Sequence, residues 1–278
     1  MDSELERLQN EGWVIPLKDK DGIFTPMLIN EELISFPSES FSGGAHNDEA
    51  SGFWATQRAN LIAEMLGATG EITLWEIGAG NGSAAIPLRN LGLNVIPVEP
   101  LRSGAVTLAK NGFITFNSTL ESLELPNNSI DAIGAFDVLE HLEKPEMLLK
   151  EIHRVLKPGG TFICSVPAYQ WLLSDFDLSI GHFRRYSRQE LRNLLMSSSL
   201  EPMNTRWLFG FLVLPALVFR RLPYLFGRRR NFSSIKNSNQ SKFDLLIALS
   251  PILKLLAKFE HKIELRFGLS LLVIARKV

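Results

Sequence analysis

The residues best suited to chemistry lie in one short glycine-rich stretch. Residues 76–82 are Glu-Ile-Gly-Ala-Gly-Asn-Gly, and they directly follow the apolar run 72–75. Closely spaced glycines after a buried strand let the backbone turn sharply and approach a ligand, because glycine has no Cβ. A second apolar run, 95–98, ends at Glu99, whose carboxylate can accept hydrogen bonds from two ribose hydroxyls. The pattern predicts a nucleotide-cofactor loop with Glu99 as its ribose ligand.

The spacing of the glycines indicates which cofactor is bound. The dinucleotide fingerprint Gly-x-Gly-x-x-Gly would need its third glycine at the position of Ser83. The stretch resembles instead the first motif of the class I S-adenosylmethionine-dependent methyltransferases, Glu-x-Gly-x-Gly-x-Gly. In that family the acidic residue faces the cofactor, and the glycines admit its ribosyl-methionine part. The resemblance implies cofactor contacts from Glu76, Gly78, Ala79, Gly80, Gly82, Glu99 and Pro100.

Later segments match further motifs of the same family, in the family's order. The apolar run 130–136 leads to Asp-Val-Leu-Glu-His at 137–141, and Leu-Lys-Pro-Gly-Gly at 156–160 precedes another apolar run. Thr119 stands where the family usually has an acidic residue for the adenine amino group. Adenine recognition would then rest on the Leu120 backbone and apolar contacts, or the affinity would be weaker. The cofactor contacts implied by these motifs are Thr119, Leu120, Phe136, Asp137 and His141.

Two residues ahead of the first motif are further candidates for cofactor binding. A helix is expected from Ser51 to about Leu66, and it carries Trp54 and Arg58. By resemblance to Phe-Trp…Arg segments in some family members, Trp54 could close over the cofactor and Arg58 could pair with the cofactor's carboxylate. A Trp that packs the helix and an Arg on the surface are equally consistent with the sequence.

A histidine after the fifth expected strand is the best candidate for a general base. Residues 175–186 hold an Asp…Gly-His-Phe-Arg-Arg-Tyr pattern that resembles a branch of small-molecule and quinone-type O-methyltransferases. Methyl transfer needs a nucleophile in line with the methyl group and help in removing the acceptor's proton. His182 would be the base, and Asp175 or Asp177 would orient it. The alternative is that His182 only pins its loop to the sheet.

Three residues that follow this histidine are expected to contact the substrate: Arg184, Arg185 and Tyr186. The arginines could hold an anionic substrate, or they could pair with acidic residues of the protein. Ser187 and Glu190 fit a capping box that starts the next helix. No cluster of His, Asp or Glu has the linear spacing of metal ligands, so no metal is expected.

Strand and helix patterns alternate along much of the chain and predict an α/β fold. The resemblance implies a Rossmann-like sheet of seven strands, with helices on both faces and the last strand antiparallel between the fifth and sixth. The third strand is expected at 114–116, and the sixth is expected to begin near Leu208. The expected organisation is an accessory N-terminal hairpin or flap (1–49), the S-adenosylmethionine-binding core (50–213), an apolar and basic helical insertion (214–267) and the final core strand (268–278).

The charge of the chain is divided unevenly. Residues 1–150 contain 9 basic and 22 acidic residues, a net charge of −13, whereas residues 151–278 contain 20 basic and 8 acidic residues, a net charge of +12. A cationic cofactor suits an acidic cleft. The basic half points toward an anionic partner.

An apolar segment in the basic half predicts a lipid contact or a lid. Residues 208–219 are apolar apart from Gly210 and Pro215, and arginines follow at 220–221 and 228–230. The run is shorter than the roughly 20 residues that span a bilayer, so it would lie on a membrane or cap the substrate pocket. With one cysteine and no signal-peptide layout at its N-terminus, the protein is expected to be cytoplasmic, with peripheral contact at the inner face of the membrane as an option.

These features predict methyl transfer from S-adenosylmethionine, with S-adenosylhomocysteine as product, to an oxygen of a hydrophobic or lipid-linked small molecule. Two alternatives stay open: a methyltransferase for a soluble metabolite, sugar or cell-envelope intermediate, and a noncatalytic cofactor-binding or membrane-associated module. A nucleic-acid partner is not expected, because the cytosine-specific Pro-Cys and the amino-specific Asn/Asp-Pro-Pro-aromatic motifs are missing. The insertion could also form a dimer face, so a homodimer is among the expectations.

Overall fold

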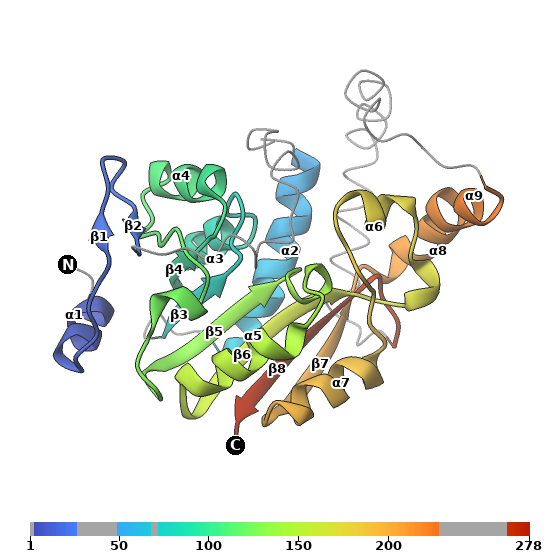
Figure 1. Cartoon of the computed structure of the whole chain (residues 1–278). Coiled ribbons are helices and arrows are strands. Elements are labelled where there is room, and N and C mark those ends of the chain that lie inside the picture. Colours follow the sequence, from blue (N-terminus) through green and yellow to red (C-terminus); the bar gives the residue numbers. More distant parts are fainter. Residues whose placement is uncertain (1–2, 27–48, 68–71, 228–265) are drawn as a thin grey trace.

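A six-stranded sheet organises the chain (Figure 1). This computed structural model describes residues 3–26, 49–67, 72–227 and 266–278. The strands of the sheet are β3 (Thr73–Ile77), β4 (Asn94–Val98), β5 (Ile130–Phe136), β6 (Leu156–Pro167), β7 (Leu200–Leu208) and β8 (Ser270–Lys277). They lie in the order β4-β3-β5-β6-β8-β7. The strands β3, β4, β5 and β6 pair in parallel, and β8 runs antiparallel between β6 and β7.

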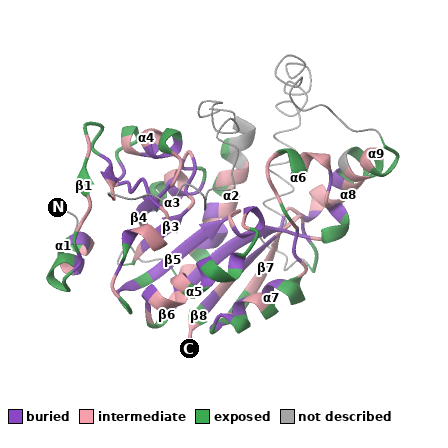
Figure 2. Ribbon diagram, in the orientation of Figure 1, coloured by how far each residue is buried: buried purple, intermediate pink, exposed green. Residues whose placement is uncertain are grey.

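Helices cover both faces of this sheet. One face carries α1 (Ser3–Asn10), α5 (Pro145–Val155) and α7 (Arg188–Ser197), and the other carries α2 (Glu49–Leu66), α3 (Ala85–Asn90) and α4 (Arg102–Lys110). Strand side chains alternate between the faces, so Trp75 joins one hydrophobic cluster and Leu74 the other. Figure 2 shows buried strands between helices with exposed outer sides. The predicted α/β fold, with an antiparallel last strand, is confirmed.

Two helices show how local sequence sets these elements. Pro145 begins α5, where its fixed φ suits the first turn. The apolar positions of α5 form one buried face: Leu148, Leu149, Ile152 and Val155. At the start of α7, Oγ of Ser187 accepts a hydrogen bond from the backbone N of Glu190 at 3.1 Å, and Oε2 of Glu190 accepts one from the backbone N of Ser187 at 2.7 Å. The predicted capping box is therefore confirmed.

Two strand predictions differ from the structure. At residues 114–116, Phe116 makes only isolated β-bridges, to Val98 and to Phe24, so the described sheet has six strands rather than seven. The sixth predicted strand was expected to begin at Leu208, where β7 ends. β7 lies at the edge of the sheet, and only its first and last residues are buried. It therefore lacks the continuous apolar run that marks a buried strand in a sequence.

The described part of the N-terminal segment packs against the sheet. β1 (Leu17–Lys18) and β2 (Phe24–Thr25) form an antiparallel pair, and Gly22 N donates to the carbonyl of Asp19 in the turn between them at 3.0 Å. The ring of Phe24 stacks on that of Phe116, with 5.0 Å between centroids. The hairpin predicted here is present as a short one, joined to the core by aromatic contact.

A helical stretch follows β7. It consists of η6 (Gly210–Leu212), α8 (Val213–Ala216), η7 (Leu217–Arg221) and α9 (Leu222–Leu225). Residues 228–265 lie outside the described ranges, and with them most of the predicted insertion. In the part of the chain that the structure describes, no helix has both the length and the apolar character to cross a bilayer.

Candidate active site

The glycine loop follows the carboxyl end of β3, the edge at which sheets of this kind bind ligands. Gly78, Gly80 and Gly82 have left-handed backbone angles, with φ of 69°, 56° and 86°. Residues with a Cβ rarely adopt such angles. A Cβ on Gly78 would also lie 2.8 Å from Cγ2 of Val138, and one on Gly82 would lie 3.0 Å from Cδ2 of Leu108. Backbone angle and close packing together favour glycine at positions 78 and 82, and the backbone angle alone favours it at position 80.

Glu99, directly after β4, anchors the glycine loop. Its Oε2 accepts a hydrogen bond from the backbone N of Gly80 at 2.6 Å, and its Oε1 accepts one from that of Leu101 at 2.7 Å. Burial raises the pKa of Glu99 to about 7, although both N–H groups favour the carboxylate. Each carboxylate oxygen has a further lone pair, so the predicted ribose contact is compatible with this anchoring.

Asn117 holds the turn that follows Glu99. Its Nδ2 donates to the carbonyl oxygen of Glu99 at 2.9 Å and to that of Pro100 at 2.8 Å. Pro100, a predicted cofactor contact, is thereby fixed next to the loop. Asn117 was not among the residues predicted from the sequence, although an amide placed directly after the apolar run 114–116 was a usable signal.

Glu76 is a carboxyl group at this edge with an oxygen that lacks a described partner. It is buried in β3, next to buried Ala79 of the loop, and its Oε2 has no hydrogen-bond partner among the described residues. Burial raises the pKa of Glu76 to about 8, although the Arg58 charge opposes this shift. A buried carboxyl group without a partner is costly, so a cationic ligand group is favoured here. The cationic amine of S-adenosylmethionine fits this requirement.

Asp137 and Arg58 link the end of β5 to the glycine loop. Asp137 has a φ of 57°, its Oδ1 accepts a hydrogen bond from Oγ of Ser165 at 2.9 Å, and its Oδ2 pairs with Arg58. Arg58 also donates to Oγ of Ser83 at 3.2 Å, and its guanidinium carbon lies 5.9 Å from the ring centroid of Phe136. Arg58 thus has an internal partner in Asp137, and its pairing with the cofactor's carboxylate stays a prediction. Ser165 was not predicted.

Trp54, on the same helix, packs against the chain that follows β7. Its ring lies perpendicular to that of Phe209 at 5.0 Å and stacks with that of Phe211 at 5.7 Å, measured between centroids. The three rings are only partly buried. They form an aromatic cluster on two segments distant in sequence, and the closure of Trp54 over the cofactor stays a prediction.

Thr119 and Leu120 have local structural partners. Oγ1 of Thr119 lies 3.0 Å from Oγ of Ser122 and accepts a hydrogen bond from the backbone N of Ser122 at 3.3 Å, at the start of η3 (Glu121–Leu123). Leu120 is fully buried in the core. Their proposed contacts with adenine would therefore come from backbone groups or apolar surface.

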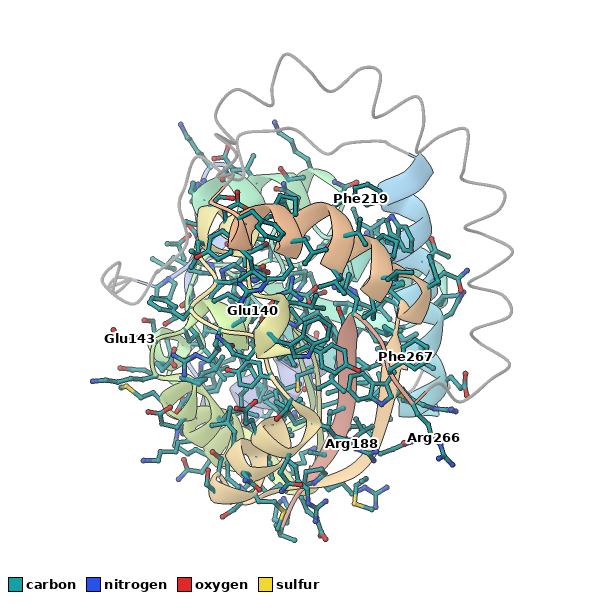
Figure 3. All side chains as sticks on the ribbon, turned by 90° about the vertical axis from the view of Figure 1, so that its right-hand side faces the viewer. Glu140, Glu143, Arg188, Phe219, Arg266 and Phe267 are labelled. Carbon is teal, nitrogen blue, oxygen red and sulfur yellow. The ribbon has the colours of Figure 1, made fainter. Side chains whose placement is uncertain are left out.

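His182 follows α6 (Asp175–Ser179) and lies against η4 (Leu139–His141). Its Nδ1 lies 3.2 Å from Oδ1 of Asp177, and its Nε2 lies 3.8 Å from Oε1 of Glu140, which Figure 3 labels. A proton donated from Nδ1 to Asp177 leaves Nε2 as the nitrogen that can accept a proton. The arrangement suits a base whose orientation is fixed by a carboxylate.

Asp177, rather than Asp175, is the carboxylate beside His182. Besides the histidine, it binds Nη2 of Arg185 at 2.6 Å and two donors of Ser174 at 2.9 Å each. Burial disfavours the charge, but the hydrogen bonds from His182 and Arg185 outweigh burial and hold the pKa of Asp177 well below its usual range. Asp175 accepts a local backbone hydrogen bond instead.

The three predicted substrate residues bind within the protein. The buried Arg185 is committed to the ion pair just described. Tyr186 is also buried, and its hydroxyl donates to the carbonyl of Leu139 at 3.1 Å. Arg184 donates to the carbonyl of Glu143 at 2.8 Å and stays partly exposed. Arg185 and Tyr186 thus have internal partners for their polar groups, and a contact of the three residues with substrate stays a prediction.

Glu140, His141 and His182 form a compact group that linear spacing did not reveal. One potential ligand atom from each lies within 4.8 Å of the others, and the two imidazole rings are 4.6 Å apart. Burial raises the pKa of Glu140 well above its usual value, and burial together with the His182 charge lowers the pKa of His141 to about 4. These groups could hold a small cation. The expectation of no metal rested on linear spacing, and it stays a prediction.

Two features together define a class of protein. One is the antiparallel last strand of the sheet, and the other is a glycine loop anchored by an acidic residue directly after the next strand. A family model described as a methyltransferase domain matches residues 51–203. The chain belongs to this family, the class I S-adenosylmethionine-dependent methyltransferases.

Relatives whose names state an activity match only part of the chain. The sterol 24-C-methyltransferase erg-4 of Neurospora crassa is 29% identical over 125 residues, 42% of this chain and 32% of that protein. A ubiquinone biosynthesis O-methyltransferase of Rickettsia conorii is 29% identical over 148 residues, 50% of this chain and 51% of that protein. The chain thus spans between about a third and a half of the length of these two relatives.

A solved structure matches more of the chain. It belongs to the complex between the Haloferax volcanii Trm112 methyltransferase activator and a methyltransferase, with a TM-score of 0.58 and 18% identity. The match covers 86% of this chain and 96% of the other. At this identity the likeness demonstrates the fold alone.

Proposed function

We propose that the protein transfers a methyl group from S-adenosylmethionine to an oxygen of a hydrophobic or lipid-linked small molecule. The observation that carries the proposal is the buried carboxyl group of Glu76, which has a raised pKa and an oxygen without a described hydrogen-bond partner. It lies beside a glycine loop that Glu99 anchors. Buried carboxyl groups with raised pKa values favour cationic ligands that restore their charge.

The chain's own groups would hold the cofactor as follows. Glu76 would face its cationic end, the glycine loop would admit its ribosyl-methionine part, and the spare lone pairs of Glu99 would accept the ribose hydroxyls. Bound S-adenosylmethionine supplies an electrophilic methyl group on a sulfonium ion. These roles account for why three left-handed glycines and two buried acids occur together.

The acceptor would lose its proton to His182. Asp177 holds Nδ1 of the imidazole, so Nε2 is the atom that would take the proton. Glu140 lies 3.8 Å from Nε2 and is buried. Burial raises the pKa of Glu140 well above its usual value, and at 3.8 Å the group makes no hydrogen bond to Nε2, which leaves this nitrogen available to the acceptor.

Apolar surface near the site supports an apolar acceptor. The aromatic cluster of Trp54, Phe209 and Phe211 is partly exposed, and Trp171 and Phe183, from the segments after β6, are half exposed. The two relatives named above act, by their names, on a sterol and in ubiquinone biosynthesis. Their names give methylation at carbon in one case and at oxygen in the other, so the oxygen acceptor rests on the proposed base.

Methyl-labelled S-adenosylmethionine would test this proposal directly. The protein would be incubated with a lipid extract and, separately, with an aqueous metabolite extract of its source cells, with Gly80→Val as the control for cofactor-dependent transfer. We expect label in the organic phase. Label confined to the aqueous extract would favour the soluble-acceptor alternative, and cofactor binding without transfer to either extract would favour a noncatalytic module.

We also propose that the helical stretch after β7 contacts an anionic membrane. Phe219, labelled in Figure 3, and Phe226 are 64% and 84% exposed, and Leu214 and Leu225 are exposed as well. The sequence places arginines at 220–221 and 228–230 beside these apolar residues. Apolar side chains flanked by arginines suit the interface of a bilayer that contains anionic lipids.

Vesicle sedimentation would distinguish a membrane contact of this stretch from a role as a lid over the substrate pocket. Phe219→Ser/Phe226→Ser should reduce binding to phosphatidylglycerol vesicles several-fold. The matched control is Val14→Ser/Leu17→Ser, which removes side chains that are 85% and 80% exposed at the other end of the chain. Equal binding by both double variants, or no binding by the unaltered protein, would leave the lid as the better interpretation.

A further inference from the structure

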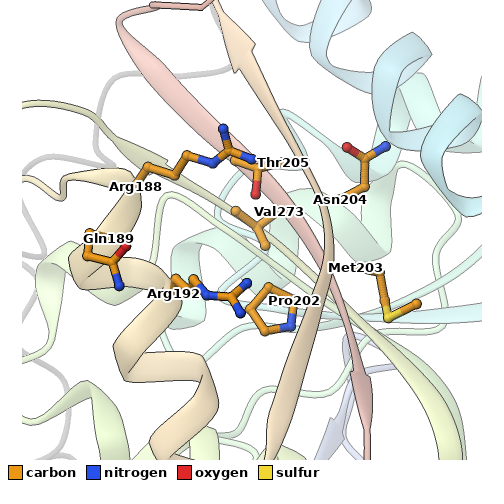
Figure 4. Close-up of a pocket in the computed structure, with 8 residues that line it drawn as sticks. All are labelled: Arg188, Gln189, Arg192, Pro202, Met203, Asn204, Thr205 and Val273. Carbon is orange, nitrogen blue, oxygen red and sulfur yellow. The ribbon is translucent and has the colours of Figure 1, made fainter.

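A pocket lies away from the candidate active site, between α7 and β7. Its volume is about 430 Å³, and Figure 4 shows the side chains around it. Its polar lining residues are Arg188, Gln189, Arg192, Asn204 and Thr205. β7 forms the sheet edge opposite β4, so β5, β6 and β8 separate this pocket from the strands that carry Glu76 and Glu99. The pocket is therefore distinct from the cofactor loop.

Two arginines give this pocket an unbalanced positive charge. Arg188 and Arg192 are exposed and lie one helical turn apart on α7, and Figure 4 shows both side chains extending toward β7. Among the residues that the structure describes, no carboxylate forms an ion pair with either arginine, and no acidic residue lines the pocket. Like charges at this spacing repel each other.

The position of Arg188 at the start of α7 is also unfavourable for a positive charge. It is the first residue of α7, where the helix dipole presents its positive end and disfavours a cation. The described contacts include no ion pair that would offset the unfavourable free energy of these two charges. An anion bound between the two arginines would attract both of them, and it would also interact favourably with the positive end of the helix dipole.

The opposite wall offers a group that suits such an anion. β7 has an irregular register against β8 between Pro202 and Asn204, and a bulge of this kind at a sheet edge redirects neighbouring side chains. The Thr205 hydroxyl then lies on the same side of β7 as the arginines, whereas the Asn204 side chain lies on the other side of the strand (Figure 4). Guanidinium groups bind phosphate oxygens through paired N–H donors, and hydroxyls complete such sites.

We propose that the pocket between α7 and β7 binds a phosphate group, carried either by a small soluble molecule or by a lipid headgroup. The net charge of +12 on residues 151–278 would raise the local concentration of such an anion. This inference does not depend on methyl transfer, because its test measures binding to the full chain without S-adenosylmethionine.

Calorimetry with pyrophosphate, at low ionic strength, is the first arm of the test. Arg188→Gln/Arg192→Gln should weaken binding at least tenfold. The matched control, Lys110→Gln/Lys150→Gln, removes two exposed cations on other helices and should leave the affinity within about twofold. Loss of the two pocket arginines removes a repulsive contact, so the melting temperature of the pocket variant should not fall.

Vesicles form the second arm and identify the source of the phosphate. If phosphatidic acid vesicles bind the protein through Arg188 and Arg192 while pyrophosphate does not, the proposal holds with a lipid headgroup. Binding of pyrophosphate with the same dependence on the arginines supports a soluble ligand. The proposal is overturned if neither probe binds, or if the pocket variant and the charge-matched control bind equally.

Discussion

Two groups of buried carboxylates occur at the ligand-binding edge of the same sheet, and they are satisfied to very different extents. At β3 and β4, Glu76 has an oxygen without a described partner, and Glu99 has two backbone donors. After β6, Asp177 receives hydrogen bonds from His182, Arg185 and Ser174. Glu76 therefore lacks a partner within the described protein, whereas Asp177 is fully paired, although the buried Glu140 beside His182 has no hydrogen-bond partner for either oxygen.

This difference has opposite effects on ionisation. Burial raises the pKa of Glu76 to about 8 and that of Glu99 to about 7. Burial acts on Asp177 in the same direction, but hydrogen bonds from His182 and Arg185 hold its pKa well below the usual range. The comparison indicates that β3 and β4 supply a binding site, whereas the Asp177 network supplies a rigid support for His182.

Gly80→Val should give the largest effect and would act only on the binding site. The branched side chain would force a backbone with a φ of 56° into a strained conformation beside Glu99. We expect no measurable S-adenosylmethionine binding by calorimetry. Gly92→Val is the control, because Gly92 has a φ of 90° with open space around it, and binding should persist there. Normal affinity in folded Gly80→Val would remove the loop from the site.

Asp177→Ala would instead test the Asp177 network that supports His182. It leaves the Arg185 charge buried without its partner, which should cost about 3 to 5 kcal/mol of unfolding free energy. Asp131→Ala removes an exposed ion pair with Lys157 and should cost about 1 kcal/mol or less. Denaturant unfolding of both variants measures the contrast, and similar losses would mean that the Asp177 network is no more structural than a surface pair.

Glu99→Ala should weaken S-adenosylmethionine binding by about 1 to 3 kcal/mol, because charge-assisted hydrogen bonds to the ribose and to the loop are lost. Glu143→Ala, on the surface after η4, should leave the affinity unchanged. Titration calorimetry compares them. If Glu99→Ala binds as tightly as the unaltered protein, the ribose role belongs to another residue.

The pH dependence of binding should follow Glu76 and be the smallest effect. Below its pKa of about 8, the ligand-free carboxyl group is mostly protonated, so a cationic ligand must displace that proton. Affinity should therefore rise by roughly tenfold from pH 6 to pH 7. Glu76→Gln cannot ionise and should show a flatter profile. A steep rise that survives in this variant would assign the proton to another group.

The cofactor half of the site could be predicted because its residues are contiguous in sequence. A glycine loop works through its own backbone angles, so residues 76–82 carry the whole signal, and Glu99 follows on the next strand. Asn117 and Ser165 lie on other segments and act through single hydrogen bonds. No local sequence pattern marks such single hydrogen bonds, so both residues were missed.

The acceptor half depended on tertiary structure. The sequence determined the α/β order, the capping box of α7 and the apolar, basic segment after β7, because periodicity and local hydrogen bonds set these features. Only the fold decided that Arg185 pairs with Asp177 and that Glu140 meets His182. It also brought Arg188 and Arg192 to one pocket beside β7. Side chains from separate segments meet only after the sheet is assembled, and burial then decides which charges need a partner.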